Sequence, residues 1–128
     1  MNDTNKTVLI VDDEGDVLMM LQKGLKAEGY RVLTADNGRD ALTIAQKRRP
    51  DAIVLDVMLP DMDGGLVANE LAEIQQTKDI PIIFLTALIS KKEEKRYGQM
   101  VGSHPTLAKP YEIHDLVEQI ERSLTCVS

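Results

Sequence analysis

The sequence predicts an α/β fold in which helices cover both faces of a parallel β-sheet. Two short runs of consecutive apolar residues, 8–11 and 52–55, are typical of strands that are buried on both faces of such a sheet. Segments with apolar residues at helical spacing follow these runs, and strands that alternate with helices form parallel sheets. The length of 128 residues predicts one domain, 1–128, with a core at about residues 6–125.

Five strands are expected, each a short apolar run bounded by turn residues. They are residues 8–11, 30–34, 52–55, 81–85 and 106–108. Gly29 precedes the second run, and a turn at 36–38 follows it. A loop at 58–65, too rich in proline and glycine to be regular, separates the third run from the next helix.

Five helices are expected between and after these strands. Apolar residues recur at helical spacing in 17–25, 41–45, 66–74 and 113–124. Gly29 and Pro50 provide stop signals for the first and second helices. The remaining helix, at 90–100, is mostly polar and has few apolar anchors, so we expect it to be the element that moves most readily.

Five alternating strands and helices predict a doubly wound sheet, with three layers in the order helices, sheet, helices. Right-handed crossovers leave few topologies, and the flavodoxin-like strand order 2-1-3-4-5 is common at this chain length. In this order the first and third strands are neighbours, so their carboxyl ends lie at the same edge. Open α/β sheets bind their ligands at that edge.

Composition argues against several classes of protein. The net charge of −6 and the pI near 4.9 argue against direct nucleic-acid binding, which usually needs a basic face. A single cysteine, Cys126, cannot form an internal disulfide and fits a reducing cytoplasm. No apolar stretch approaches membrane-spanning length, and the N-terminus lacks a hydrophobic signal region. We therefore expect a cytoplasmic protein with neither nucleic-acid nor membrane partners.

Polar residues follow four of the expected strands at one edge of the sheet. Asp12 and Asp13 follow the first strand, and Asp56 follows the third. Thr86 and Lys109 end the fourth and fifth strands. Three carboxylates are costly together unless a cation compensates them or one of them reacts. Hard oxygen donors suit Mg²⁺, with Mn²⁺ as the alternative, and an aspartate can attack phosphorus to give an aspartyl phosphate.

These residues make the chain resemble, over nearly its full length, the receiver domain of two-component response regulators, in particular the stand-alone, chemotaxis-regulator-like type. The matching motifs, in chain order, are Asp12-Asp13, Asp56, Pro60-Asp61-Met62-Asp63-Gly64, Thr86-Ala87 and Lys109-Pro110. Each motif alone is weak. Together, in this order and at these spacings, they are highly specific for the family.

The resemblance implies a magnesium-dependent phosphoacceptor site. Asp56 would accept a phosphoryl group from a histidine kinase or phosphotransfer protein. Asp13, Asp56 and the backbone carbonyl of Met58 would bind Mg²⁺, while Asp12 would act through water. Such a phosphoprotein relays signals in a two-component system and is not an enzyme, although it catalyses its own phosphorylation and slow dephosphorylation.

The resemblance also implies how phosphorylation is read. Lys109 would contact the phosphoryl oxygens, the Thr86 hydroxyl would switch toward them, and the Lys109–Pro110 peptide bond would be cis. With no DNA-binding output domain in the chain, the output would be contact with a downstream protein target. The protein would act as a monomer or as a phosphorylation-dependent dimer.

Two departures from the family pattern affect the readout and the lifetime of the phosphoryl group. Receivers usually carry an aromatic residue three positions before the lysine, where this chain has Thr106, so the aromatic part of the switch is absent or rebuilt. Met58 and Leu88 are expected to flank the phosphoryl group, and neither apolar side chain can orient an attacking water. We therefore expect slow self-dephosphorylation.

Two other functions are considered. A degenerate receiver would act only as a binding scaffold; Thr106 favours this reading, and the complete set of acids with Lys109 argues against it. A magnesium-dependent aspartyl-phosphate hydrolase needs a second aspartate two positions after the nucleophile, where Met58 stands. Each site residue also has a separate structural explanation, such as a helix cap for Asp12, but the phosphoacceptor site explains them all at once.

Overall fold

The computed structural model describes residues 6–86, 100–101, 104–108 and 112–125. These residues form a six-stranded sheet in the order β2-β1-β3-β4-β6-β5, together with four helices. The strands are β1 (Thr7–Val11), β2 (Arg31–Ala35), β3 (Ala52–Asp56), β4 (Ile82–Thr86), β5 (Met100–Val101) and β6 (His104–Ala108). The helices are α1 (Gly15–Ala27), α2 (Gly38–Arg48), α3 (Gly64–Glu73) and α5 (Ile113–Thr125).

The α/β class and the parallel sheet are confirmed. Strands β2, β1, β3, β4 and β6 pair in parallel and in this order. The sheet has six strands instead of the five expected, because the two-residue strand β5 pairs antiparallel with β6. The expectation of five helices stays a prediction, since the fourth was expected at 90–100 and residues 87–99 lie outside the described part of the chain.

The predicted helix at 90–100 is wrong at its final residue. Met100 lies in β5 and pairs with Pro105 of β6, and Val101 pairs with His104. Only two residues separate the strands, which is the length of a tight hairpin connection, so this local pairing competes with a helix. The rest of the predicted helix lies outside the described residues.

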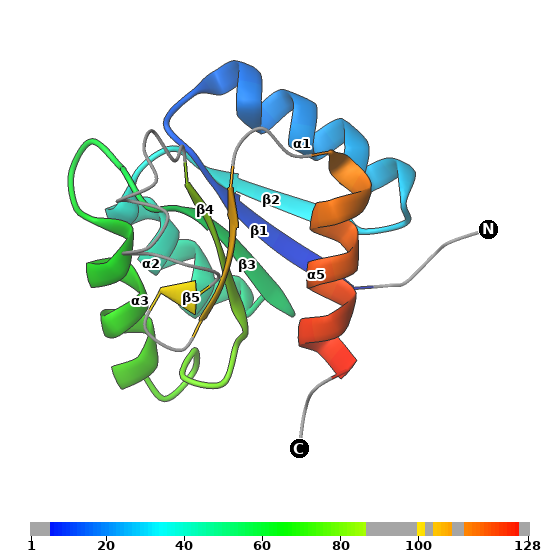
Figure 1. The fold of residues 1–128 in the computed structure, drawn as a ribbon. Helices are drawn as coiled ribbons and strands as arrows, with labels where there is room; N and C mark the ends of the chain where they lie inside the picture. The colour runs from blue at the N-terminus through cyan, green and yellow to red at the C-terminus, as the bar shows by residue number, and fades with distance from the viewer. Residues whose placement is uncertain (1–5, 87–99, 102–103, 109–111, 126–128) are drawn as a thin grey trace.

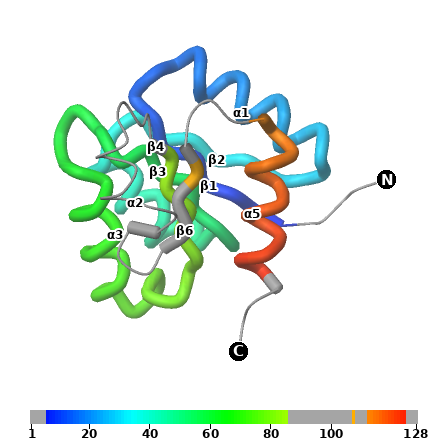
Figure 2. Tube along the Cα trace, in the orientation of Figure 1, coloured from blue at the N-terminus to red at the C-terminus, as the bar shows by residue number. Residues whose placement is uncertain are grey.

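The sheet separates two buried clusters, each covered by two of the described helices (Figure 1). Successive side chains of a strand point to opposite faces, so β1 contributes Leu9 and Val11 to one cluster and Val8 and Ile10 to the other. Residues of α2 and α3 complete the first cluster, and residues of α1 and α5 complete the second. Figure 2 shows α1 and α5 on the same side of the sheet. The predicted arrangement of three layers is therefore observed for the described helices.

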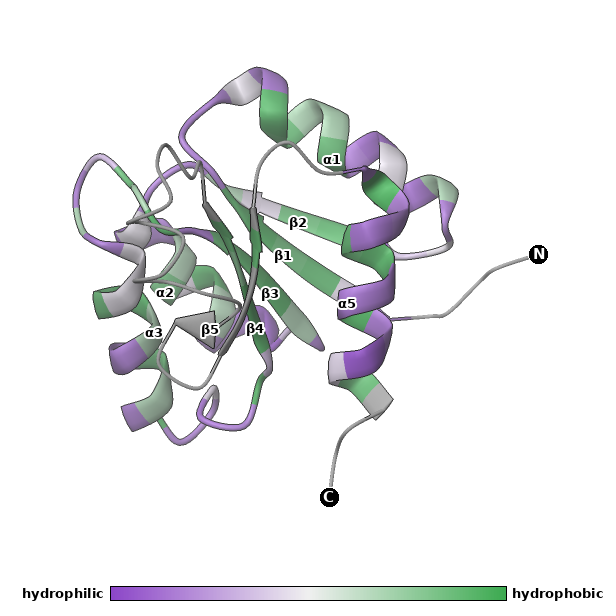
Figure 3. Ribbon diagram, in the orientation of Figure 1, coloured by the Kyte–Doolittle hydropathy of each residue, from purple (hydrophilic) through white to green (hydrophobic). Residues whose placement is uncertain are grey.

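Hydropathy follows this arrangement. Figure 3 shows hydrophobic strands in the middle of the fold and helices that carry both hydrophilic and hydrophobic residues. Val8, Leu9, Ile10 and Val11 are all fully buried, as a strand covered on both faces requires. In the part of the chain that the structure describes, none of the helices combines the length and the apolar character needed to span a bilayer.

The register of the parallel strands brings their carboxyl ends to one edge of the sheet. Val11 at the end of β1 pairs with Leu55, the residue before the end of β3. Asp56 in turn pairs with Leu85, one residue before the end of β4. Residues that end or follow these strands therefore meet at one level, and this edge holds the candidate site.

Candidate functional site

Three aspartates converge at the carboxyl edge of the sheet. One carboxylate oxygen of Asp12, one of Asp13 and one of Asp56 lie within 4.8 Å of one another. Asp12 is fully buried, Asp56 is 7% exposed and Asp13 is exposed. Negative charges at such distances repel each other strongly when water is excluded. The cluster that the strand ends predicted is therefore present, and a positive charge would relieve its repulsion.

Asp12 connects the end of β1 to the start of α1. Its backbone N–H donates to the carbonyl of Ala35 at 3.2 Å, and its Oδ1 accepts the N–H of Glu14 at 2.9 Å. Glu14 is itself the N-cap residue of α1 and makes no side-chain cap bond. Asp12 therefore shapes the turn before the helix, although it is not the N-cap residue, and it also places a buried carboxylate in the cluster.

Asp56 is the last residue of β3, and its side chain is oriented by the loop that follows. Its Oδ1 accepts the N–H of Met58 at 3.0 Å. The Met58 side chain is 74% exposed, and its backbone forms an antiparallel bridge with Asp63. The loop thus folds back on itself directly beside the acid cluster.

Gly64 allows this loop to close against the backbone that carries Asp56. The Gly64 N–H donates to the carbonyl of Val57 at 2.7 Å. A Cβ atom at position 64 would lie 2.5 Å from the carbonyl oxygen of Asp56 and 2.9 Å from the Cα of Val57. No side chain can be accommodated at this position without a clash, which explains why the Pro60–Gly64 motif ends in glycine.

Asp61 fixes the same loop to a different helix. Its Oδ1 accepts the N–H of Gly38 at 2.8 Å, and its Oδ2 accepts the N–H of Arg39 at 3.0 Å. These hydrogen bonds, first that from Gly38 and then that from Arg39, lower the pKa of Asp61 from its usual value. The sequence placed Asp61 only within a motif, because its partners lie 22 and 23 residues away and leave no local signal.

The other residues predicted for the site are described in part. The Thr86 backbone ends β4 and pairs with Ala108 of β6, while its side chain lies outside the described part. Lys109 directly follows β6 in the sequence, and it lies outside the described residues together with Pro110, the expected cis peptide bond and Leu88. The backbone of Thr106 pairs with Phe84.

The donors in the cluster fit a hard divalent cation. The three converging side chains offer only carboxylate oxygens, which Mg²⁺ prefers, and the excess of negative charge matches a doubly charged ion. Asp12 is fully buried, and a cation would reduce the cost of a buried carboxylate beside two others. The acidic cluster is therefore compatible with Mg²⁺ binding and with phosphorylation of an aspartate.

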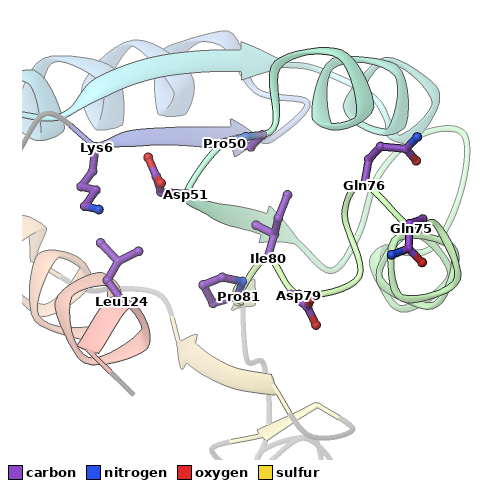
Figure 4. Close-up of a pocket in the computed structure, with 9 residues that line it drawn as sticks. All are labelled: Lys6, Pro50, Asp51, Gln75, Gln76, Asp79, Ile80, Pro81 and Leu124. Carbon is purple, nitrogen blue, oxygen red and sulfur yellow. The ribbon is translucent and has the colours of Figure 1, made fainter. Parts of the chain in front are cut away.

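A separate pocket lies at the opposite edge of the sheet (Figure 4). Its volume is about 310 Å³, and its lining comes from the segments that precede β1, β3 and β4 and from Leu124 near the end of α5. Lys6, Asp51 and Asp79 supply its charged groups. None of the residues predicted for the site lines this pocket, so the acid cluster is a different site.

Comparisons with known proteins agree with this geometry. The family described as the response regulator receiver domain matches residues 8–121. The transcriptional regulatory protein PrrA of Mycobacterium tuberculosis is 38% identical over 121 residues, which cover 94% of this chain and 51% of PrrA. The chain spans about half the length of the curated relatives it matches.

Solved structures give the same assignment. The chemotaxis protein CheY4 of Vibrio cholerae has a TM-score of 0.81 and 36% identity, covering 93% of this chain and 98% of that chain. The receiver domain of a sensor histidine kinase from Pseudomonas aeruginosa has a TM-score of 0.83 and 28% identity, covering 94% and 98%. That protein holds a magnesium ion coordinated in its active-site cleft. The chain belongs to the response regulator receiver domain family.

Proposed function

We propose that the protein is a phosphorelay signalling protein that accepts a phosphoryl group on Asp56 with the help of Mg²⁺. The convergence of three aspartates, each with an oxygen within 4.8 Å of the others, carries this proposal. Receiver domains interact with histidine kinases and phosphotransfer proteins, and we propose one of these as the donor to Asp56. Such domains are signalling proteins and not classical enzymes.

The proposed transfer is a displacement at phosphorus. A carboxylate oxygen of Asp56 attacks the phosphorus of a phosphohistidine, so a new O–P bond forms and the P–N bond breaks. The imidazole leaves with the electrons of that bond and takes up a proton. The Met58 N–H bond to Oδ1 of Asp56 supports this role, because it fixes the carboxylate in one orientation before the donor arrives.

Burial distinguishes the three aspartates. Asp12 has no exposed surface and is bonded to the N–H of Glu14, so an incoming phosphohistidine cannot reach it. Asp13 is exposed, and Asp56 keeps a small exposed surface at the end of the strand. Burial excludes Asp12 as the acceptor. By analogy with the receiver family, we assign Asp56 as the phosphoacceptor and Asp13 as a direct metal ligand, with Asp12 acting through water.

The metal site would be completed by the loop after β3. We assign the backbone carbonyl of Met58 as a ligand beside Asp13 and Asp56, because the loop at Met58 folds directly beside the cluster. Bound Mg²⁺ supplies positive charge that neutralises the negative charge developing on the transferred phosphoryl oxygens.

Two further residues are proposed to contact the phosphoryl group. Thr86 ends β4 in register with Ala108, and Lys109 follows Ala108 in the chain. We assign Lys109 as the cation that pairs with the phosphoryl oxygens and Thr86 as the hydroxyl that reports phosphorylation. The backbone of Thr86, in the strand beside β3, supports its assignment, and Lys109 is the residue that follows Ala108, the partner of Thr86.

We propose a single receiver domain over residues 1–128, located in the cytoplasm, whose output is contact with a protein target. The net charge of −6 supports a protein partner over nucleic acid. The signal would pass through a monomer or through a dimer that forms on phosphorylation.

Acetyl phosphate and beryllofluoride with Mg²⁺ test the phosphoacceptor. We expect intact mass spectrometry to detect one added phosphoryl group in the wild-type protein and none in Asp56→Asn. Asp79→Asn is the matched control, since exposed Asp79 lies at the opposite edge of the sheet and should not affect the adduct. No adduct on the wild-type protein would leave only the scaffold function, and sustained turnover of a phosphomonoester would instead indicate a hydrolase.

A further inference from the structure

The loop after β3 is held at both of its ends by contacts within the loop. The Met58–Asp63 bridge and the bond from the Gly64 N–H to the Val57 carbonyl close the loop across its base. These contacts do not involve α2. Asp61 lies near the middle of the loop between these contacts, and Met62 is the next residue.

Asp61 ties this middle part of the loop to the N-terminus of α2. Its two carboxylate oxygens accept the N–H groups of Gly38 and Arg39, the first two residues of the helix, at 2.8 and 3.0 Å. Both N–H groups lack partners within the helix, and the positive end of the helix dipole favours a carboxylate there. The helix has a separate N-cap, Asn37, whose side chain accepts the N–H of Asp40 at 2.8 Å.

Close packing accompanies these hydrogen bonds. Gly38 is buried, and a Cβ atom at this position would lie 2.4 Å from Cγ and 2.8 Å from Sδ of Met62. It would also lie 2.9 Å from a methyl group of Val67 in α3. The loop therefore rests on the start of α2 through a charged contact at Asp61 and an apolar contact at Met62.

We propose that Asp61 is a positioning residue for the magnesium site, because it holds the backbone at Met58 through the N-terminus of α2. This inference rests on the proposed function, which assigns the Met58 carbonyl to the metal. Without the contact to α2, Met58 would be held only by its bridge to Asp63 and by its N–H bond to Asp56, and we expect a smaller fraction of molecules to have Met58 in the binding geometry. The apparent dissociation constant rises as that fraction falls.

The size of the expected effect follows from the single ligand involved. Loss of an outer contact that orients a metal ligand typically weakens metal binding by about 10- to 100-fold. Asp61 acts on one of the proposed ligands, and Asp13 and Asp56 would remain in place. We therefore expect Asp61→Ala to weaken Mg²⁺ binding by about tenfold.

Calorimetric titration of the full chain with Mg²⁺ tests the proposal, with Asn37→Ala as the matched control. Both variants remove hydrogen bonds from the N-terminus of α2, so both should lower the unfolding temperature. Of these two variants, Asp61→Ala should weaken Mg²⁺ binding and Asn37→Ala should not. Asp61→Asn, which keeps one acceptor oxygen, should have an intermediate effect. Met62→Ala should also weaken binding without a change of charge.

A repeat at about 1 M salt separates positioning from long-range charge, since the Debye length is then about 3 Å. A weakening that persists at high salt supports positioning, and one that disappears overturns it. An unchanged Mg²⁺ affinity in Asp61→Ala and Met62→Ala would show that Asp61 is only a helix cap. If the wild-type protein itself fails to bind Mg²⁺, the proposed function fails instead, so the two failures are distinguishable.

Discussion

Replacing Asp13 by asparagine should stabilise the fold when no divalent cation is present. Asp12, Asp13 and Asp56 each have one carboxylate oxygen within 4.8 Å of an oxygen of the other two. At that separation Coulomb's law gives about 0.9 kcal/mol of repulsion for each pair of unit charges in water. Asp13 is exposed and has two such neighbours, so we expect its replacement to raise the free energy of unfolding by about 1–2 kcal/mol at low salt.

Thermal unfolding of the wild-type protein and Asp13→Asn, first with a chelator and then with Mg²⁺, measures this effect. For a domain of this length, each kcal/mol shifts Tm by about 4 °C. Mg²⁺ should stabilise the wild-type protein more than the variant, which has lost a proposed ligand. Asp79→Asn removes an exposed charge at the opposite edge and should change little. An equal gain in Asp79→Asn, or no gain in Asp13→Asn, would refute the reasoning.

Three further predictions concern other parts of the molecule. Gly64→Ala should lower the free energy of unfolding by about 1–3 kcal/mol in chemical denaturation, because the added Cβ would lie 2.5 Å from the Asp56 carbonyl oxygen. Gly15→Ala is the control: a Cβ there would have no neighbouring atom within 4 Å, so it should carry no such penalty. Burial, and then the nearby Glu121 and Glu28, raise the pKa of Tyr30 above its usual value of 10.0. The contribution of Tyr30 to the free energy of unfolding is therefore present below pH 10.0 and is lost as the pH rises through the folded-state pKa. Tyr30→Phe should therefore flatten the alkaline loss of stability, and an identical pH profile would contradict this. Met58→Asn should shorten the phosphoryl lifetime followed by mass spectrometry, since asparagine can orient a water; equal lifetimes would argue against the expected slow dephosphorylation.

The strand order and the acid cluster could be predicted because their signals are local. Runs such as 8–11 and 52–55 identify buried strands by their apolar residues alone, and the carboxylates are the next residues in the chain. Parallel pairing then brings those chain positions together without any further information about side chains. The convergence of Asp12, Asp13 and Asp56 follows from this geometry.

Other features had no such signal. The strand Met100–Val101 is only two residues long, too short for a period of two to be read, and it exists through its pairing with His104 and Pro105. The contact from Asp61 to α2 joins positions 22 and 23 residues apart, and any aspartate in a loop has the same local pattern. Sequence periodicity reports which face of an element is buried, but it does not report which loop a helix end will meet.

The sharing of β1 between the two buried clusters has a consequence for how the protein opens. β1 is hydrogen-bonded to β2 on one side and to β3 on the other, and it contributes fully buried side chains to both clusters. Amide hydrogens in such a central strand exchange with solvent only through global unfolding, whereas peripheral segments exchange through local opening. Asp12 and Asp56 are attached directly to β1 and β3, so fluctuations that open the outer helices should leave these two carboxylates in register.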